Sequence, residues 1–168
     1  PTAEKQGSGS AINSGSSGWD VTLVADDSVT GMAGLTIGGG YSEHERTAAS
    51  GDASDMTVYA TYAMGGLTVG YQWSEADLGT SSGAQQYDND GYGITFAIND
   101  DLSIGYNHYE SEQTNTTNVT SEATSVQIAY SMGGASVRLA SADGENMAYQ
   151  TGADYDRDVT TLSVALAF

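Results

Sequence analysis

An alternation of apolar and polar residues recurs along this chain and limits the folds open to it. In residues 66–73 every second residue is apolar, from Leu67 to Trp73, and Thr, Gly and Gln stand between them. Residues 158–168 repeat the pattern. Successive side chains of a β-strand point to opposite faces of its sheet, so this period of two predicts strands with one apolar and one polar face.

Nine segments carry this alternation, and we find no extended stretch with the 3.6-residue period of an amphipathic helix. The expected strands are residues 19–26, 32–43, 55–64, 66–75, 91–98, 101–110, 122–132, 134–142 and 158–168. The sequence therefore predicts an all-β protein.

The connections alternate between short and long. Short turns are expected at residues 26–31, 64–66, 99–101 and 132–134, and long polar links at residues 44–54, 76–90, 111–121 and 143–157. This order is typical of an antiparallel up-and-down meander with every long loop at one end. We expect residues 1–18 to be a Gly/Ser-rich loop segment and residues 19–168 to carry the strands.

Composition excludes several classes of function. The chain has 168 residues and a net charge of −18, with 22 acids against four Lys and Arg residues. Nucleic acid is excluded as a partner because phosphate binding requires clustered cations. The absence of Cys excludes disulfides and thiolate metal sites.

Charge and aromatic placement favour a transmembrane β-barrel over a soluble sandwich. Strand interiors hold few charges, namely Arg138 and, near a strand start, Asp20. Aromatic residues of the apolar face fall at two levels, as the girdles of a membrane barrel do. Those expected at the long-loop end are Trp19, Tyr41, Trp73, Tyr92 and Tyr106, and those at the short-turn end are Tyr62, Phe96, Tyr130 and Phe168. The strand lengths suit a tilted crossing of a bilayer.

The final residues, Val164-Ala-Leu-Ala-Phe168, resemble the closing strand of bacterial outer-membrane β-barrels, which the assembly machinery reads. With the Gly-Gly turns, acidic loops and Tyr-rich strands, the chain resembles the C-terminal portion of an alphaproteobacterial general porin. The resemblance implies an outer-membrane location in a Gram-negative bacterium, a 16-stranded barrel and a homotrimer. It also implies contact with outer-membrane lipid and lipopolysaccharide, and ion transport by passive diffusion of ions and small hydrophilic solutes.

The number of expected strands is consistent with two kinds of barrel. Nine strands of a meander cannot close as the even-numbered bacterial barrels do, so we interpret the segment as part of a larger barrel. The alternative is a complete eight-stranded barrel with an adhesion or structural role, in which residues 19–26 lie outside the barrel. The small residues of the polar face, such as Gly70, Ser103 and Ser136, favour the larger barrel because a narrow lumen must be filled by side chains.

The polar face supplies the candidate pore-lining residues, which are Asp20, Tyr59, Gln72, Asn107, Gln127 and Arg138. The resemblance implies that Arg138 belongs to a cationic wall that orients polar solutes. The alternative is a single arginine that is paired or extends toward water.

Most of the acids lie in the long links or at the strand ends beside them. Asp154, Asp156 and Asp158 are candidate Ca²⁺ ligands because hard cations prefer carboxylate oxygens. They do not form an EF-hand, since Val159 stands where that loop requires Gly. We expect no required cofactor, with Ca²⁺ at the acidic outer loops as a hypothesis and a solvated acidic rim as its alternative.

An enzymatic function is not expected. His44 and His108 are the two histidines of the chain, and neither stands beside a nucleophile in the sequence. The sequence therefore predicts a passive channel.

Overall fold

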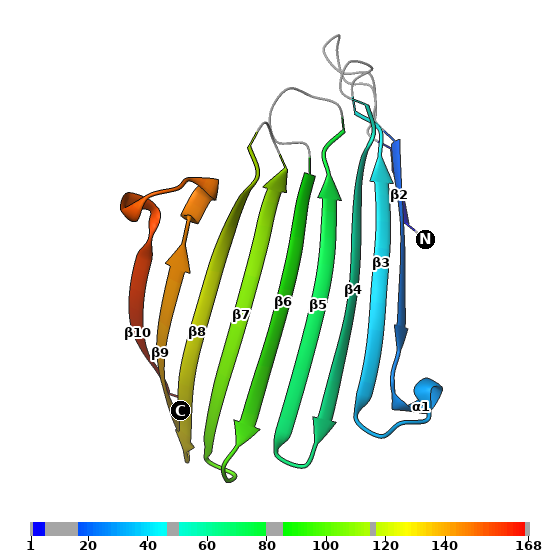
Figure 1. Ribbon diagram of the computed structural model, residues 1–168. Helices are drawn as coiled ribbons and strands as arrows, with labels where there is room; N and C mark the ends of the chain where they lie inside the picture. The colour runs from blue at the N-terminus through cyan, green and yellow to red at the C-terminus, as the bar shows by residue number, and fades with distance from the viewer. Residues whose placement is uncertain (1, 6–16, 47–50, 80–85, 115–116, 167–168) are drawn as a thin grey trace.

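The computed structural model describes residues 2–5, 17–46, 51–79, 86–114 and 117–166. In these ranges the chain forms one antiparallel sheet whose ten strands are hydrogen-bonded in sequence order (Figure 1). The strands are β1 (Thr2–Lys5), β2 (Ser17–Ala25), β3 (Leu35–His44), β4 (Ala53–Met64), β5 (Leu67–Asp77), β6 (Gln86–Ala97), β7 (Leu102–Thr114), β8 (Val119–Met132), β9 (Ala135–Glu145) and β10 (Arg157–Leu166). Helical turns are confined to α1 (Asp27–Thr30), η1 (Met147–Tyr149) and η2 (Ala153–Tyr155) in the described part of the chain.

The up-and-down meander is confirmed. Figure 1 shows the short connections at one end of the sheet and the long ones at the other. The β4–β5 and β8–β9 turns pass through Gly65-Gly66 and Gly133-Gly134, where Gly65 has φ 59° and Gly133 has φ 57°. Glycine is favoured there because a Cβ destabilises left-handed backbone.

The β2–β3 connection is not the tight hairpin that the sequence suggested. Asp26 caps the short helix α1 by accepting a hydrogen bond from the Ser28 amide at 3.0 Å, and Gly31 ends it with φ 71°. Hydrogen bonds from Ser28 hold the pKa of the Asp26 carboxyl below its ordinary value. As a result β3 begins at Leu35 and not at residue 32.

Several strands extend further toward the long-loop end than expected. Strand β6 begins at Gln86, β7 continues to Thr114 and β8 begins at Val119. The expected link at residues 111–121 is therefore largely strand. In these extensions both faces of the sheet are polar, so apolar and polar residues do not alternate along the strand and the sequence gives no strand signal there.

The N-terminal segment also differs from expectation. Residues 1–18 were expected to be loop, yet Thr2–Lys5 form β1 and pair with Ser17–Asp20 of β2. Residues 1 and 6–16 lie outside the described residues. Backbone pairing thus begins before residue 19.

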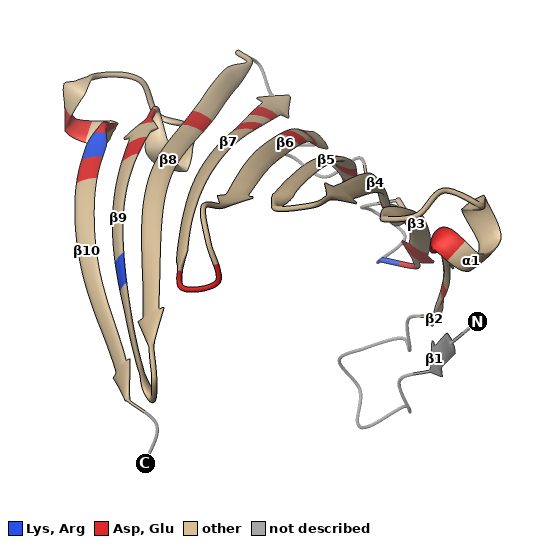
Figure 2. Ribbon diagram, turned by 90° about the horizontal axis from the view of Figure 1, so that it is seen from below, with Lys and Arg blue, Asp and Glu red and all other residues tan. Residues whose placement is uncertain are grey.

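The sheet is curved but open (Figure 2). Within the described residues, β1 pairs with β2, β10 pairs with β9, and the two outer strands do not pair with one another. A closed eight-stranded barrel is therefore not formed. Strand β2, which that barrel would leave out, pairs with β3 from Gly18 to Ala25.

Register places apolar residues opposite one another on one face. Ile128 lies opposite Ile104 and Leu139, and Leu139 lies opposite Leu162. This face has no second layer, since Ala53 is the one buried hydrophobic residue of the described chain and Leu162 is 66% exposed. The described chain is thus a single sheet without a core, and none of its helices is long and apolar enough to span a membrane.

Candidate functional site

The polar face is the concave side of the curved sheet. Two hollows, of about 540 and 410 Å³, are lined mainly by residues of this face. Tyr59, Gln72 and Asn107 line the larger hollow, and Asp20 and Gln72 line the smaller. Four of the six candidate pore-lining residues are therefore brought together on one surface.

The remaining two candidates lie on the same face further along the sheet. The Gln127 Nε2 atom is 3.1 Å from the point that a Cβ would occupy at Gly105. Arg138 lies opposite Ala129 and Ser163, and it is not part of the one ion pair found among the described residues. Arg138 is thus a cation on a wall of small residues.

Glycine determines how two tyrosines lie against the concave wall. A Cβ at Gly38 would come within 2.4 Å of the Tyr59 ring, so this ring covers the glycine directly. The Tyr109 ring similarly lies 3.5 Å from the Cβ position of Gly91, and its hydroxyl donates to the Asn89 side chain at 2.7 Å. Both rings therefore lie along the wall beside the larger hollow.

The opposite, convex face carries the aromatic residues expected at the long-loop end. Ring centroids are 5.2 Å apart for Trp19 and Tyr41, and 6.2 Å for Tyr92 and Tyr106. Trp73 belongs to the same face and lies opposite Val58 and Asp90. These contacts join neighbouring strands at one level of the sheet.

Sequence reasoning left Tyr71 out of that aromatic set. Tyr71 lies opposite Tyr92, is 49% exposed, and its hydroxyl donates to Asp90. Its position two residues before Trp73 was a sufficient signal, because both side chains must share a face. Tyr71 therefore belongs with the long-loop aromatics.

Three of the four aromatic residues expected at the short-turn end are described, and they lie in register with apolar partners. Tyr62 lies opposite Leu35 and Val69. Phe96 lies opposite Leu67 and Ile104. Tyr130 lies opposite Leu102 and Val137. Phe168 lies outside the described residues. The apolar face thus carries aromatics at both ends.

Carboxylates follow the aromatics on the convex face at the long-loop end. Glu110 lies opposite Asp90 and Glu122, and Glu122 lies opposite Glu145. Like charges directly opposite one another destabilise a strand pair. This acidic band, defined by Asp90, Glu110, Glu122 and Glu145, is therefore a region of electrostatic repulsion.

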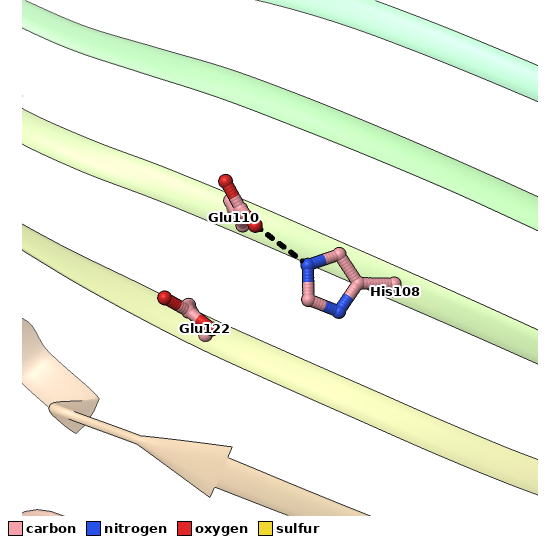
Figure 3. Close-up of side chains that lie close together, drawn as sticks. All are labelled: His108, Glu110 and Glu122. Carbon is pink, nitrogen blue, oxygen red and sulfur yellow. Dashed lines mark hydrogen bonds and ion pairs between the residues drawn. The ribbon is translucent and has the colours of Figure 1, made fainter.

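His108 lies beside two residues of this band, Glu110 and Glu122 (Figure 3). Its Nε2 lies 2.8 Å from Glu110 Oε1 and its Nδ1 lies 2.9 Å from Thr124 Oγ1. Ligand atoms of His108, Glu110 and Glu122 all lie within 4.8 Å of one another. The ion pair accounts for His108 and Glu110 without a metal, and the Glu110 side chain is 47% exposed, so the trio offers an ion pair and not a closed metal site.

The structure does not bring the candidate Ca²⁺ ligands into one cluster. Among the described residues, Asp154, Asp156 and Asp158 do not form a group with mutually close ligand atoms. Asp154 lies in η2, the Asp156 carboxylate accepts from the Asn146 amide at 3.1 Å, and Asp158 lies opposite Asp143 on β9. The three carboxylates are thus directed to different neighbours, and the described geometry does not gather them into one Ca²⁺ site.

A further contact connects the β9–β10 loop to the concave face. The Tyr149 hydroxyl lies 2.7 Å from Ser111 Oγ, which is itself 2.5 Å from Asn89 Oδ1, and the Tyr149 ring packs on Tyr87 at 5.2 Å. Tyr149 has φ 55°, an uncommon value for a residue with a side chain. The sequence offered no signal for this inward contact beyond a tyrosine in a polar link.

Neither a family model nor a curated protein matches the chain. The arrangement itself offers an apolar convex surface, a polar concave surface and an acidic band at one end. These features suit contact with two different solvents.

Proposed function

We propose that this chain forms part of the wall of an outer-membrane porin, a water-filled channel through which ions and small hydrophilic solutes diffuse passively. One observation carries the proposal: a single-layered sheet exposes large apolar side chains across its convex face while its concave face is polar. A water-soluble sheet of this kind would bury the apolar face against a second layer. In a membrane barrel lipid covers that face instead.

The apolar surface of the convex face is large, so its exposure to water is unfavourable in free energy. Leu23 is 75% exposed, Leu162 66% and Val126 57%. Each such side chain gains about 1.5–3 kcal/mol when it is taken out of water completely. Lipid contact along strands β2 to β10 supplies this gain without any further protein layer.

The two ends of the convex face suit the two membrane interfaces. Aromatic rings favour the boundary between hydrocarbon and headgroups. At the long-loop end the acidic band adjoins Tyr92, at the level where lipid headgroups begin. Divalent cations such as Ca²⁺, held between this band and lipopolysaccharide phosphates, would relieve the repulsion between Glu110 and Glu122.

Closure of the channel requires additional strands. In hydrocarbon every backbone amide and carbonyl must be paired, so an open edge at β10 cannot face lipid. We take the described sheet as one part of a larger barrel, and the resemblance to trimeric general porins supplies the proposed assembly.

Transport in this proposal needs no catalytic group. Small side chains on the concave face leave room for water, and Arg138 on β9 and Asp20 on β2 each contribute a charge to this face. Solutes are then sorted by size and charge as they diffuse.

Conductance in planar bilayers tests the proposal. The reconstituted protein is expected to give discrete, ohmic steps that rise with salt concentration. A folded, membrane-inserted protein with no conductance would contradict the channel and favour an adhesion or structural role.

A further inference from the structure

The larger hollow on the concave face combines three features that suit one class of ligand. It has a volume of about 540 Å³, which lies within the range of small-molecule sites, about 300–1,000 Å³. Its lining includes Tyr59 and Tyr109 together with amide and hydroxyl side chains. None of its lining residues is an acid, a lysine or an arginine.

Tyr59 provides a fixed aromatic surface. A Cβ at Gly38 would lie 2.4 Å from the Tyr59 ring, so the ring is packed against the wall at this glycine. Tyr59 also lines the hollow, so part of its side chain is left for contact with a solute there. Tyr109, which is 46% exposed, has a comparable position over Gly91 on the other side.

The floor between these rings is open because it is built from glycine. Gly70, Gly91 and Gly93 line the hollow and place no side chain in it. Their neighbours on the same face are threonines and amides, which present hydrogen-bonding groups. The result is a recess that a planar or ring-shaped solute can enter.

Hydrogen-bonding groups are available in the hollow. Gln72 is exposed and Tyr59 is half-buried, and neither the Gln72 side chain nor the Tyr59 hydroxyl makes a hydrogen bond to a described residue. Asn107 is held in place by donating to Ser125 Oγ. An amide offers both donors and an acceptor, and a hydroxyl offers one of each kind, so together they match the hydroxyl groups of a polyol.

The larger hollow has no acid, lysine or arginine in its lining, although Asp20 and Arg138 lie elsewhere on the concave face. His108 contributes to the lining, but register places its side chain on the convex face, where it contacts Glu110. An ionic solute would find no opposite charge in the hollow. A neutral solute that carries both C–H faces and many hydroxyls matches rings and amides together.

We propose that this hollow is a low-affinity binding site for neutral sugars, with Tyr59 as a stacking surface and Gln72 as a hydrogen-bonding group. The proposal rests on the porin function proposed above and narrows its solute class. Weak binding on the wall raises the local concentration of a sugar in the channel without blocking its exit.

Saturation-transfer NMR with sucrose, on the whole protein in detergent micelles, tests this site independently of conductance. Four proteins are compared: the unaltered chain, Tyr59→Ala, Tyr59→Phe and Tyr62→Ala. Tyr62 is the matched control because it lies on the same strand and its side chain is on the convex face. Circular dichroism and heat-modified electrophoretic mobility verify that each variant folds.

Transfer to sucrose is expected in the unaltered chain, in Tyr59→Phe and in Tyr62→Ala, and a loss of at least half the signal is expected in Tyr59→Ala. Equal transfer in Tyr59→Ala, or equal transfer to polyethylene glycol of the same size, would overturn the sugar site. Channels that conduct without sucrose transfer would also overturn it, while leaving the porin function in place. Sucrose transfer without conductance would retain the site and contradict the porin.

Discussion

The ring of Tyr59 on β4 occupies the space over Gly38 on β3, and a Cβ at Gly38 would lie 2.4 Å from the Tyr59 Cζ atom. The two residues lie directly opposite one another in the register of the β3–β4 pair. A glycine and a tyrosine thus fit together as one surface of the concave wall. This fit lets an aromatic side chain lie along a wall that otherwise carries small residues.

Replacing Gly38 with Ala is expected to destabilise the fold by about 1–3 kcal/mol, because the added methyl group must displace the Tyr59 ring. Denaturant unfolding in detergent micelles measures the change. Gly70→Ala is the control, since a Cβ there meets Thr61 Cγ2 at an ordinary 3.4 Å. The double variant Gly38→Ala/Tyr59→Ala should recover most of the loss, and an equal loss in both backgrounds would contradict the close fit.

Arg138 is expected to oppose cation permeation through the channel. Its replacement by Ala removes a positive charge from the concave face, so the K⁺/Cl⁻ permeability ratio should rise, and Arg138→Glu should raise it further. Reversal potentials in a salt gradient give this ratio. Leu139→Ala, at the adjacent residue on the convex face, serves as the control. An unchanged ratio in Arg138→Glu would remove Arg138 from the pore.

The acidic band should become more stable when its central charge is reversed. Glu122 lies between Glu110 and Glu145, so Glu122→Lys replaces two repulsive cross-strand pairs with attractive ones. The expected gain is about 0.5–2 kcal/mol at low salt, and it should shrink in 1 M salt through screening. Glu122→Gln, which removes repulsion without adding attraction, should give a smaller gain.

Calcium provides a second measurement on the same band. Ca²⁺ titration should raise the melting temperature of the unaltered protein more than that of Glu122→Lys. An equal response of both proteins, or no response at low salt, would contradict cation binding at this band.

Tyr149 is expected to hold the β9–β10 loop against the concave face. Tyr149→Phe removes the contact with Ser111, which is 2% exposed, at a local cost of about 1 kcal/mol. Hydrogen exchange should then speed up in residues 146–156 and remain unchanged in β4 and β5. Tyr155→Phe is the control because Tyr155 is in the same loop and makes no side-chain hydrogen bond to a described residue. Equal exchange in the two variants would show that the contact does not hold the loop.

The sequence was sufficient to predict nine of the ten described strands, β2 to β10, with their order and their apolar face, because alternation with period two is a direct consequence of strand geometry. The register, such as Ile128 opposite Leu139, then follows from short Gly-Gly turns. Strand ends were harder to predict. Glu112 and Thr120 lie opposite each other near the ends of β7 and β8. Polar residues occupy both faces of the sheet there, so the sequence of these strand ends has no alternation of apolar and polar residues.

The candidate site residues were also predictable only in part. Tyr59, Gln72 and Asn107 were predictable because face alone brings them together. The fit of Tyr59 to Gly38 depends on register between strands, and the Tyr149–Ser111 contact depends on a loop folding back over residues distant in sequence. Neither of these two contacts produces a pattern in the local sequence from which it could be predicted.

The central claim is that lipid covers the convex face and water fills the concave one, and site-directed spin labelling tests it most directly. The chain has no cysteine, so single-cysteine variants can place a label at each residue from Ser125 to Ser131 on β8 in reconstituted vesicles. We predict that collisions with oxygen are high at Val126, Ile128 and Tyr130, and that collisions with a water-soluble nickel reagent are high at Ser125, Gln127 and Ala129. Nickel accessibility at Ile128 equal to that at Gln127, or protection of Ile128 from both reagents, would contradict it.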